Sequence, residues 1–215
     1  MQNVPALKAL DHLLLGAADL DAGIVWVERL TGVRPAIGGS HPGMGTHNAL
    51  LSLGGRQYLE IIAPDPKQAQ YTFFVDLRGF TEPRLVTWAA LSTDIDRLAT
   101  RAAGAGLRVS GPRDGSRLTP DGRRLQWRTL GITSNAGDAH AEPVPFLIQW
   151  SGGSVHPSQD SPAGCRMQSF VLHHPDPERV ADVLRKLGLE ADLRRSDGIR
   201  LTATLDTPKG VVELG

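Results

Sequence analysis

The chain has 215 residues, enough for one large domain or for two or three small modules that share a core. Its 23 basic and 23 acidic residues cancel without any block of like charge, which argues against a nucleic-acid-binding surface or a polybasic membrane patch. The single cysteine, Cys165, excludes an intrachain disulfide, and no apolar stretch has the length of a signal peptide or membrane span, so we expect a cytoplasmic protein.

The first 64 residues predict one strand, one helix and a following group of strands. Residues 9–17 form an apolar run, and Asp19 is a good helix start for residues 22–30, which Gly32 ends. A Gly/Pro-rich loop is expected over residues 35–45. The runs at residues 48–53 and 57–62, separated by a Gly-Gly turn, predict an antiparallel hairpin.

The same pattern recurs twice. In the second copy, over residues 84–150, strands are expected at residues 85–92, 107–110, 123–130 and 146–150, with a helix from Asp94 to about Ala103. In the third, shorter copy, over residues 165–215, a strand at residues 167–172 precedes a helix at 177–187 and strands at 199–205 and 211–214. Residues 65–83 and 151–164 are polar connections, and residues 131–143 form a loop long enough for a lid or a tolerated insertion.

Two polar side chains interrupt apolar strands of the first copy. His12 lies in the run from Leu10 to Gly16, and Glu60 lies in the run from Tyr58 to Pro64. By strand alternation, His12 should share a face with Leu10 and Leu14. A buried imidazole and carboxylate cost free energy unless they are paired. We therefore expect both to face a cavity, a ligand or an ion, the alternative being a hydrogen bond or ion pair that only links two strands.

Three strand-helix-strand-strand-strand units, with a histidine in the first strand and a glutamate in the last, resemble the vicinal oxygen chelate superfamily. That superfamily includes glyoxalase I, extradiol dioxygenases and bleomycin-resistance proteins. Residues 45–54, residues 58–64, residues 145–150 and the His156-Pro157 pair are similar to its bacterial glyoxalase-like group. The resemblance implies an α+β fold of βαβββ modules, two of which form a cup from a mixed sheet. The third copy would pack against this cup or mediate a homodimer.

The resemblance also implies positions for metal ligands on the first and last strands of each unit. His12 and Glu60 occupy these positions in the first copy, whereas Thr87 and Gln149 occupy them in the second. Ser169 and Glu213 are at the matching places of the third. A divalent ion such as Zn, Ni, Mn or Fe needs several strong donors, and only His12 and Glu60 are strong. The expected metal site is therefore incomplete.

Other residues are candidate contacts of a small-molecule ligand. His47 could complete a ligand set with His12 and Glu60, or hydrogen-bond a loop carbonyl or a substrate oxygen. Gln149 could be a substituted ligand, a substrate-binding amide or a satisfied core amide. Thr87 and Trp88 are further candidates for substrate binding. Trp127 could form an aromatic wall of the ligand site or pack within the sheet, and Trp150 is expected to pack in the core or on the sheet surface.

Two functions follow from these expectations. One is a glyoxalase-like lyase, isomerase or dioxygenase, in which a metal on His12 and Glu60 stabilises an enediolate-like intermediate or, without metal, Glu60 acts as a base. The other is metal-free binding or sequestration of a small organic molecule, as in the bleomycin-resistance type. Neither function involves a nucleic acid or a membrane.

Overall fold

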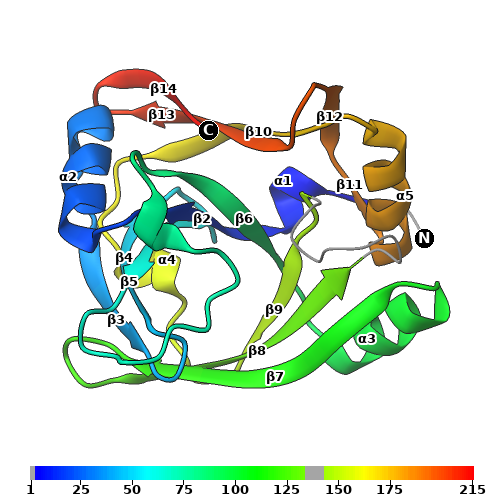
Figure 1. Cartoon of the computed structure of the whole chain (residues 1–215), viewed down its shortest axis with the longest axis horizontal. Coiled ribbons are helices and arrows are strands. Elements are labelled where there is room, and N and C mark those ends of the chain that lie inside the picture. The colour runs from blue at the N-terminus through cyan, green and yellow to red at the C-terminus, as the bar shows by residue number, and fades with distance from the viewer. Residues whose placement is uncertain (1–2, 134–142) are drawn as a thin grey trace.

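The computed structural model describes residues 3–133 and 143–215. The fold is α+β and rich in strands, with a large curled mixed sheet at its centre (Figure 1). Within the described residues, no helix combines the length and the apolar character needed to cross a membrane. The expected loop at residues 131–143 falls largely on residues 134–142, which lie outside the described residues.

The first module follows the expected order. Its helix begins where the Asp19 side chain accepts a hydrogen bond from the Ala22 N–H at 2.8 Å, and it ends at Gly32, whose φ of 82° suits glycine. The elements are β2 (Leu10–Gly16), α2 (Leu20–Thr31), β3 (Ala36–His41), β4 (Thr46–Ser52) and β5 (Tyr58–Pro64). A strand, β3, thus replaces part of the loop expected over residues 35–45, because it pairs with β4 despite its glycines.

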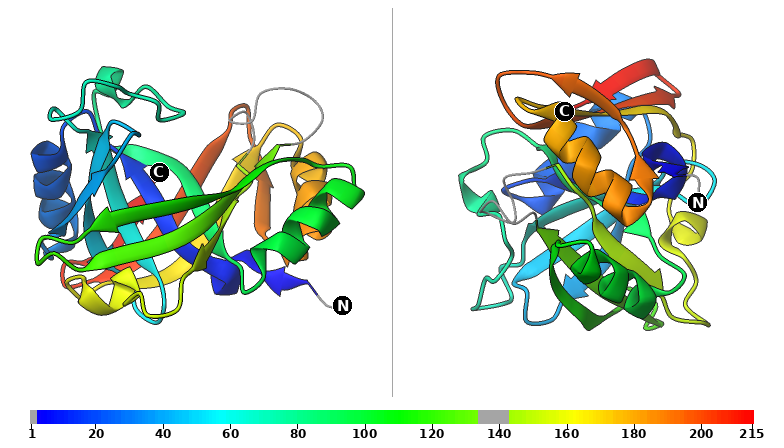
Figure 2. Two further views of the ribbon diagram at one scale, coloured as in Figure 1. Left: turned by 90° about the horizontal axis from the view of Figure 1, so that it is seen from below. Right: turned by 90° about the vertical axis from the view of Figure 1, so that its right-hand side faces the viewer.

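The second module repeats this order and extends the same sheet. Its elements are β6 (Arg84–Leu91), α3 (Ile95–Gly104), β7 (Arg108–Leu118), β8 (Arg124–Thr133) and β9 (Phe146–Trp150), and η1 (Leu77–Gly79) lies in the connection before it. The strand order is β3-β4-β5-β2-β6-β9-β8-β7, with β2 and β6 antiparallel at the centre. The sheet curls until its two edge strands, β3 and β7, contact one another, which makes the cup (Figure 2).

The third module forms a smaller sheet against the outside of the cup. After α4 (Pro157–Asp160), its elements are β10 (Arg166–His174), α5 (Pro177–Leu187), β11 (Leu189–Glu190), β12 (Asp192–Arg195), β13 (Arg200–Thr207) and β14 (Gly210–Leu214). The strand order is β12-β10-β13-β14, and α5 lies beside α3 (Figures 1 and 2). At the N-terminus, β1 (Val4–Pro5) pairs with β11 and is followed by α1 (Ala6–Ala9).

One apolar core joins all three modules. Side chains on the outer face of the central sheet, such as Leu13 and Ile61, belong to the same buried cluster as Phe170 and Leu184 of the third module. The apolar face of the third sheet is therefore covered within the chain, and it gives no reason of its own to expect the homodimer, which remains a prediction. On the inner face, Leu14 of β2 and Ile62 of β5 pack against Phe73 and Leu77 of the connection between the first two modules.

Candidate functional site

A β-bulge at Asp11 places two neighbouring polar side chains together. Leu10 pairs with Ala90 of β6 and His12 pairs with Ala89, so β2 carries one extra residue at this point. Leu10 consequently packs in the outer core, and the expectation that it shares a face with His12 is wrong. The bulge lets the Asp11 and His12 side chains meet, with 2.7 Å between Asp11 Oδ1 and His12 Nδ1.

The buried Asp11 carboxylate collects three hydrogen-bond donors. Besides His12, its Oδ2 atom accepts from His156 Nε2 at 3.0 Å and from Trp150 Nε1 at 3.1 Å. The Ser158 N–H donates to His156 Nδ1 at 3.3 Å, which leaves the proton of His156 on Nε2, facing Asp11. Asp11 in turn requires a proton on His12 Nδ1. The network therefore leaves His12 Nε2 as the atom that can exchange a proton.

Asp11 is ionised in this environment. Burial alone would raise the pKa of Asp11, but hydrogen bonds from His12 and His156 outweigh it and hold the pKa well below its usual value. The carboxylate is 1% exposed, so its charge is compensated by these donors rather than by water. Asp11 thus fixes the ring orientation of His12, in the manner of a carboxylate behind a reactive histidine.

A second network orients Glu60. Asn48 Nδ2 donates to Glu60 Oε1 at 2.8 Å and lies 3.2 Å from His41 Nε2, while His41 Nδ1 lies 2.9 Å from Thr46 Oγ1. Burial lowers the pKa of His41, which keeps the ring neutral, with Nδ1 donating to Thr46 and Nε2 accepting from Asn48. These contacts fix the position of the Glu60 carboxylate.

The two networks converge on one atom pair. His12 Nε2 lies 3.4 Å from Glu60 Oε2, and the two residues are 3% and 7% exposed. Both atoms are acceptors in the neutral-histidine, ionised-glutamate state, so the pair needs a proton or a ligand donor between them. Tyr58 stacks on the His12 ring with 4.5 Å between centroids, which further restricts ring rotation. The arrangement can accept a proton from a bound molecule and return it.

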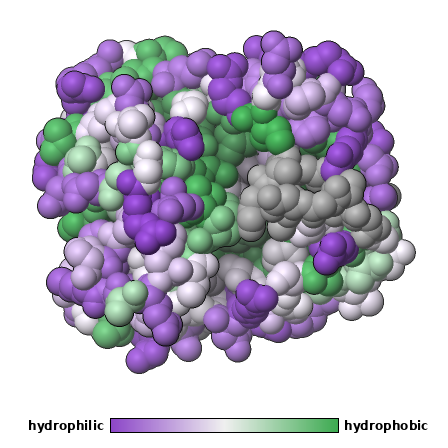
Figure 3. Space-filling view, viewed as in Figure 1, coloured by the Kyte–Doolittle hydropathy of each residue, from purple (hydrophilic) through white to green (hydrophobic). Residues whose placement is uncertain are grey.

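The opposite side of the cup carries a cation and an aromatic wall. Arg117 of β7 is 5% exposed and donates to the Gly38 carbonyl oxygen of β3, which ties the two edge strands together. Half-buried aromatic side chains continue this inner face. The ring centroids of Trp127 and Trp150 are 5.6 Å apart, and Phe146 lies edge-on to His12. The space-filling view is hollowed near its centre, with hydrophobic residues around the hollow (Figure 3).

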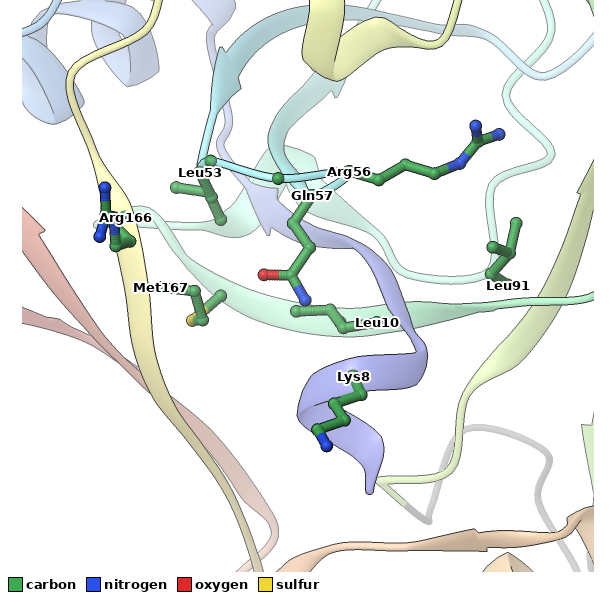
Figure 4. Close-up of a pocket in the computed structure, with 10 residues that line it drawn as sticks. Lys8, Leu10, Leu53, Arg56, Gln57, Leu91, Arg166 and Met167 are labelled. Carbon is green, nitrogen blue, oxygen red and sulfur yellow. The ribbon is translucent and has the colours of Figure 1, made fainter. Parts of the chain in front are cut away.

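A separate open pocket of about 460 Å³ lies away from these networks, between α1, the turn after β4 and the start of β10. Its cationic residues are Lys8, Arg56 and Arg166, whose charged ends point in different directions, while the Gln57 amide points toward Leu10 (Figure 4). Gln57 Nε2 donates to the Leu7 carbonyl oxygen at 2.5 Å. This pocket offers no converging set of polar groups, so the candidate site is the inner face of the cup.

Comparison with known families agrees with this architecture. The sequence model of the family described as a glyoxalase-like domain matches residues 10–188, from the start of β2 to the end of α5. The protein belongs to this glyoxalase-like family. Membership places it in the vicinal oxygen chelate superfamily. No curated protein sequence matches the chain.

One solved structure shows the same fold at low sequence identity, and two others are more distantly similar. A hypothetical protein from Staphylococcus aureus is 15% identical, with a TM-score of 0.70 over 89% of this chain and 87% of that one. Methylmalonyl-CoA epimerase from Mycobacterium tuberculosis is 21% identical, with a TM-score of 0.46 over 70% of this chain and 91% of that one. A Streptomyces coelicolor methylmalonyl-CoA epimerase variant, in complex with 2-nitronate-propionyl-CoA, is 18% identical, with a TM-score of 0.48 over 68% and 97%.

The residues singled out in the sequence have different places in this glyoxalase-like protein. His12 and Glu60 lie together, and Thr87 is half-buried on the same inner face, paired with Leu14. His47 lies on β4 between Thr46 and Asn48, and strand alternation puts it on the opposite, outer face. Trp88 is fully buried in the outer core and donates from Nε1 to the Pro143 carbonyl oxygen at 2.9 Å.

Gln149 also lies outside the inner face. Its Oε1 atom accepts from the Ile95 N–H at 2.7 Å, at the first residue of α3. That carbonyl oxygen therefore satisfies a helix N-terminus. The three interpretations of Gln149 remain predictions about function, and its observed contact is the one a satisfied amide makes.

The donors for a divalent metal ion are incomplete. The resemblance to the superfamily implies histidine and glutamate ligands for such an ion, and here His12 and Glu60 face one another. His41 Nε2, 3.5 Å from Glu60 Oε1, accepts from Asn48 instead. Among the described residues, no group of three or more His, Cys, Asp or Glu side chains is placed to hold a metal ion. The residues do not fit a complete family metal site.

Sequence reasoning missed much of both networks. Asp11, His41, Asn48, Arg117 and His156 were not assigned to the site, and Trp150 was expected to pack only. The one local signal is the His156-Pro157 pair after a strand, which brings His156, 2% exposed, beneath β2. The others depend on the bulge and on contacts between distant strands, for which the sequence carries no short motif.

Proposed function

We propose that the protein binds a small organic molecule on the inner face of the cup and transfers a proton on it, as a glyoxalase-like isomerase or lyase. The observation that carries the proposal is the His12–Glu60 pair, held at 3.4 Å by two separate hydrogen-bond networks. Such preorganisation of a base is what proton abstraction from carbon requires. A purely structural link between β2 and β5 would need neither network.

The proposed step begins with a C–H bond next to a carbonyl group. His12 Nε2 takes the proton, the C–H electron pair forms a carbon–carbon double bond, and the carbonyl electrons move to oxygen to give an enolate. Return of the proton to the same carbon gives an epimer. Where that carbon also carries a hydroxyl group, transfer of the hydroxyl proton to the enolate oxygen and return of the carbon proton to the former carbonyl carbon give an isomer. Loss of a leaving group from the carbon next to the deprotonated one gives elimination. Glu60, 3.4 Å from Nε2, stabilises the imidazolium formed, or takes the proton itself.

Carbon-bound deuterium uptake tests this proposal without a known product. The protein is incubated in D2O with 2-oxo acids, hydroxyketones, 1,2-diketones and the hemithioacetal of methylglyoxal, and loss of C–H signal is followed by NMR. We expect uptake for a subset of these compounds, lost in His12→Asn and in Glu60→Gln. Glu213→Gln is the matched control, because Glu213 is an exposed glutamate on β14 at the corresponding position of the third module. Uptake that is unchanged in both site variants would contradict the proposal.

The same assay addresses metal dependence. It is repeated after addition of Zn, Ni, Mn or Fe, with metal analysis of wild type, His12→Ala and Glu60→Ala. We expect no ion to be retained at one per chain, because the described residues offer two strong donors at this point. Stoichiometric binding that both substitutions abolish would instead support a metal-dependent reaction.

The second candidate is binding or sequestration without chemistry. The half-buried aromatic wall of Phe146, Trp127 and Trp150 favours it, since such a surface can hold an organic molecule whether or not a proton moves. Saturable binding of a panel compound, with no deuterium uptake by any compound, would favour this function over the first.

A further inference from the structure

Arg117 carries a positive charge at a buried position. The residue is 5% exposed, and its guanidinium donates a hydrogen bond to the Gly38 carbonyl oxygen. Among the described residues, no carboxylate forms an ion pair with it. Buried arginines are ordinarily paired with a carboxylate or a phosphate, because an unpaired charge is costly away from water.

The Arg117 side chain faces the inside of the cup. Gly115, two residues earlier on β7, pairs with Trp127, and a Cβ on Gly115 would lie 2.3 Å from Trp127 Nε1, so the indole covers this face of β7. Trp127 is edge-on to His41, with 6.4 Å between ring centroids. Residues two apart share a face of a strand, so Arg117 lies on the side of β7 that carries the aromatic wall.

The charge of Arg117 also reaches the groups around Glu60. Its positive charge lowers the pKa of His41 and opposes the rise in the pKa of Tyr58, although burial is the larger cause in both cases. Glu60 is the carboxylate whose charge acts on Arg117, but Glu60 is already engaged by Asn48 and faces His12. An anion bound in the cup could therefore pair with Arg117, which has no ion-pair partner among the described residues, near the His12–Glu60 pair.

We propose that Arg117 binds a permanent anionic group, a carboxylate or a phosphate, of the molecule whose proton the His12–Glu60 pair moves. The substrate class is thus a small carbonyl compound with one anionic end. This inference rests on the proposed function for the role of the pair, but the binding step stands apart from it. A planar guanidinium with free N–H groups suits two oxygen atoms of such an anion.

The alternative is that Arg117 only ties β3 to β7. Matched ligand pairs separate the two roles, since a structural tie would not distinguish a charged from a neutral ligand. We would compare 2-oxobutyrate with its methyl ester, and hydroxyacetone phosphate with hydroxyacetone, by titration calorimetry. The two pairs distinguish a carboxylate ligand from a phosphate ligand.

We expect wild type to bind one of the anions at least about tenfold more tightly than its neutral partner. Arg117→Gln should remove this preference, Arg117→Lys should keep part of it, and Arg124→Gln should leave it unchanged. Arg124 is the matched control, because it is an exposed arginine on the neighbouring strand β8. If Arg117→Gln does not fold, the affinities of the charged and neutral ligands are compared in wild type and in Arg117→Lys, and this comparison tests the inference.

The inference would be overturned if wild type bound neither anion, or bound the anions no more tightly than their neutral partners. It would also be overturned if Arg117→Gln kept the full preference for the anion. Titrations are repeated in Glu60→Gln, which cannot use Glu60 as a base. Arg117-dependent binding without deuterium uptake in wild type would leave the inference standing and remove the proposed function. Equal deuterium uptake into the charged and the neutral compounds would leave the proposed function standing and remove the inference about Arg117.

Discussion

Replacing Asp11 by asparagine tests the hydrogen-bond network behind His12. The amide oxygen can accept from both His156 and Trp150, so the favoured orientation points the amide nitrogen at His12 Nδ1. Nδ1 must then accept, and the His12 proton moves to Nε2, toward Glu60. The base proposed for catalysis would be in the wrong tautomer.

The expected cost in stability follows from the same contacts. Two charge-assisted hydrogen bonds become neutral ones, at about 0.5–1 kcal/mol each, and the third is reversed, for a total of roughly 2 kcal/mol. For a chain of this size that corresponds to a fall in melting temperature of about 4–8 °C. Deuterium uptake should fall about 100-fold or more because the base is lost.

Urea denaturation and histidine nitrogen NMR measure these effects. In wild type, the unfolded Asp11 takes up a proton below its ordinary pKa of 3.8 while the folded carboxylate stays ionised, so the contribution of Asp11 to stability is lost as the pH falls below that value. The stability difference between wild type and Asp11→Asn should therefore be constant above about pH 4 and shrink below it. An unchanged His12 tautomer, or a difference independent of pH down to about pH 3, would refute this account.

Three further predictions concern the supporting structure. Gly38→Ala should lower the free energy of unfolding by about 1–3 kcal/mol in urea denaturation, because the new Cβ would lie 2.2 Å from Asn48 Oδ1. Gly79→Ala is the control: its new Cβ would have no atom within 4 Å, so the free energy of unfolding should not change. Burial lowers the pKa of His41 in the folded protein, so as the pH falls below the ordinary histidine pKa of 6.5 the unfolded state takes up this proton first and stability is lost. In His41→Gln, the free energy of unfolding should therefore fall less steeply below that pH. A pH profile like that of wild type would contradict this. Leu205→Ala, at a fully buried position of the third module, should lower the free energy of unfolding by about 2–5 kcal/mol. The unfolding midpoints followed by circular dichroism and by tryptophan fluorescence should shift equally. Separate transitions would show that the modules unfold independently.

The sequence predicted the regular elements well where local signals mark them. The helix α5 spans Pro177–Leu187 as expected, because Asp176, a proline at its start and Gly188 define both ends. The strand β3 was missed because glycines replace the alternation that indicates a strand, and β12 because its residues are polar and mostly exposed. Pairing with a neighbouring strand overrides the weak local preference in both.

The candidate site divides in the same way. His12 and Glu60 attract attention because a charged or polar residue in an apolar run is unusual, and the structure places them 3.4 Å apart. Arg117 escaped notice because it lies in a mostly polar edge strand, and its burial depends on the contact with β3. The role of Asp11 depends on a strand irregularity that arises only when β2 pairs with β6. Tertiary pairing, rather than any local motif, assembles these residues.

The bulge at Asp11 makes the length of β2 a determinant of which side chains surround His12. From His12 onward, the alternation of Leu13 and Leu15 into the outer core fixes which side chains face inward. Deleting Asp11 would restore regular pairing with β6 at this point, with Leu10 still opposite Ala90 and His12 still opposite Ala89, so His12 would keep its orientation. The imidazole would stay where it is and lose its carboxylate. In this protein, a one-residue change in strand length, with the fold unchanged, is enough to separate the proposed base from the carboxylate that orients it.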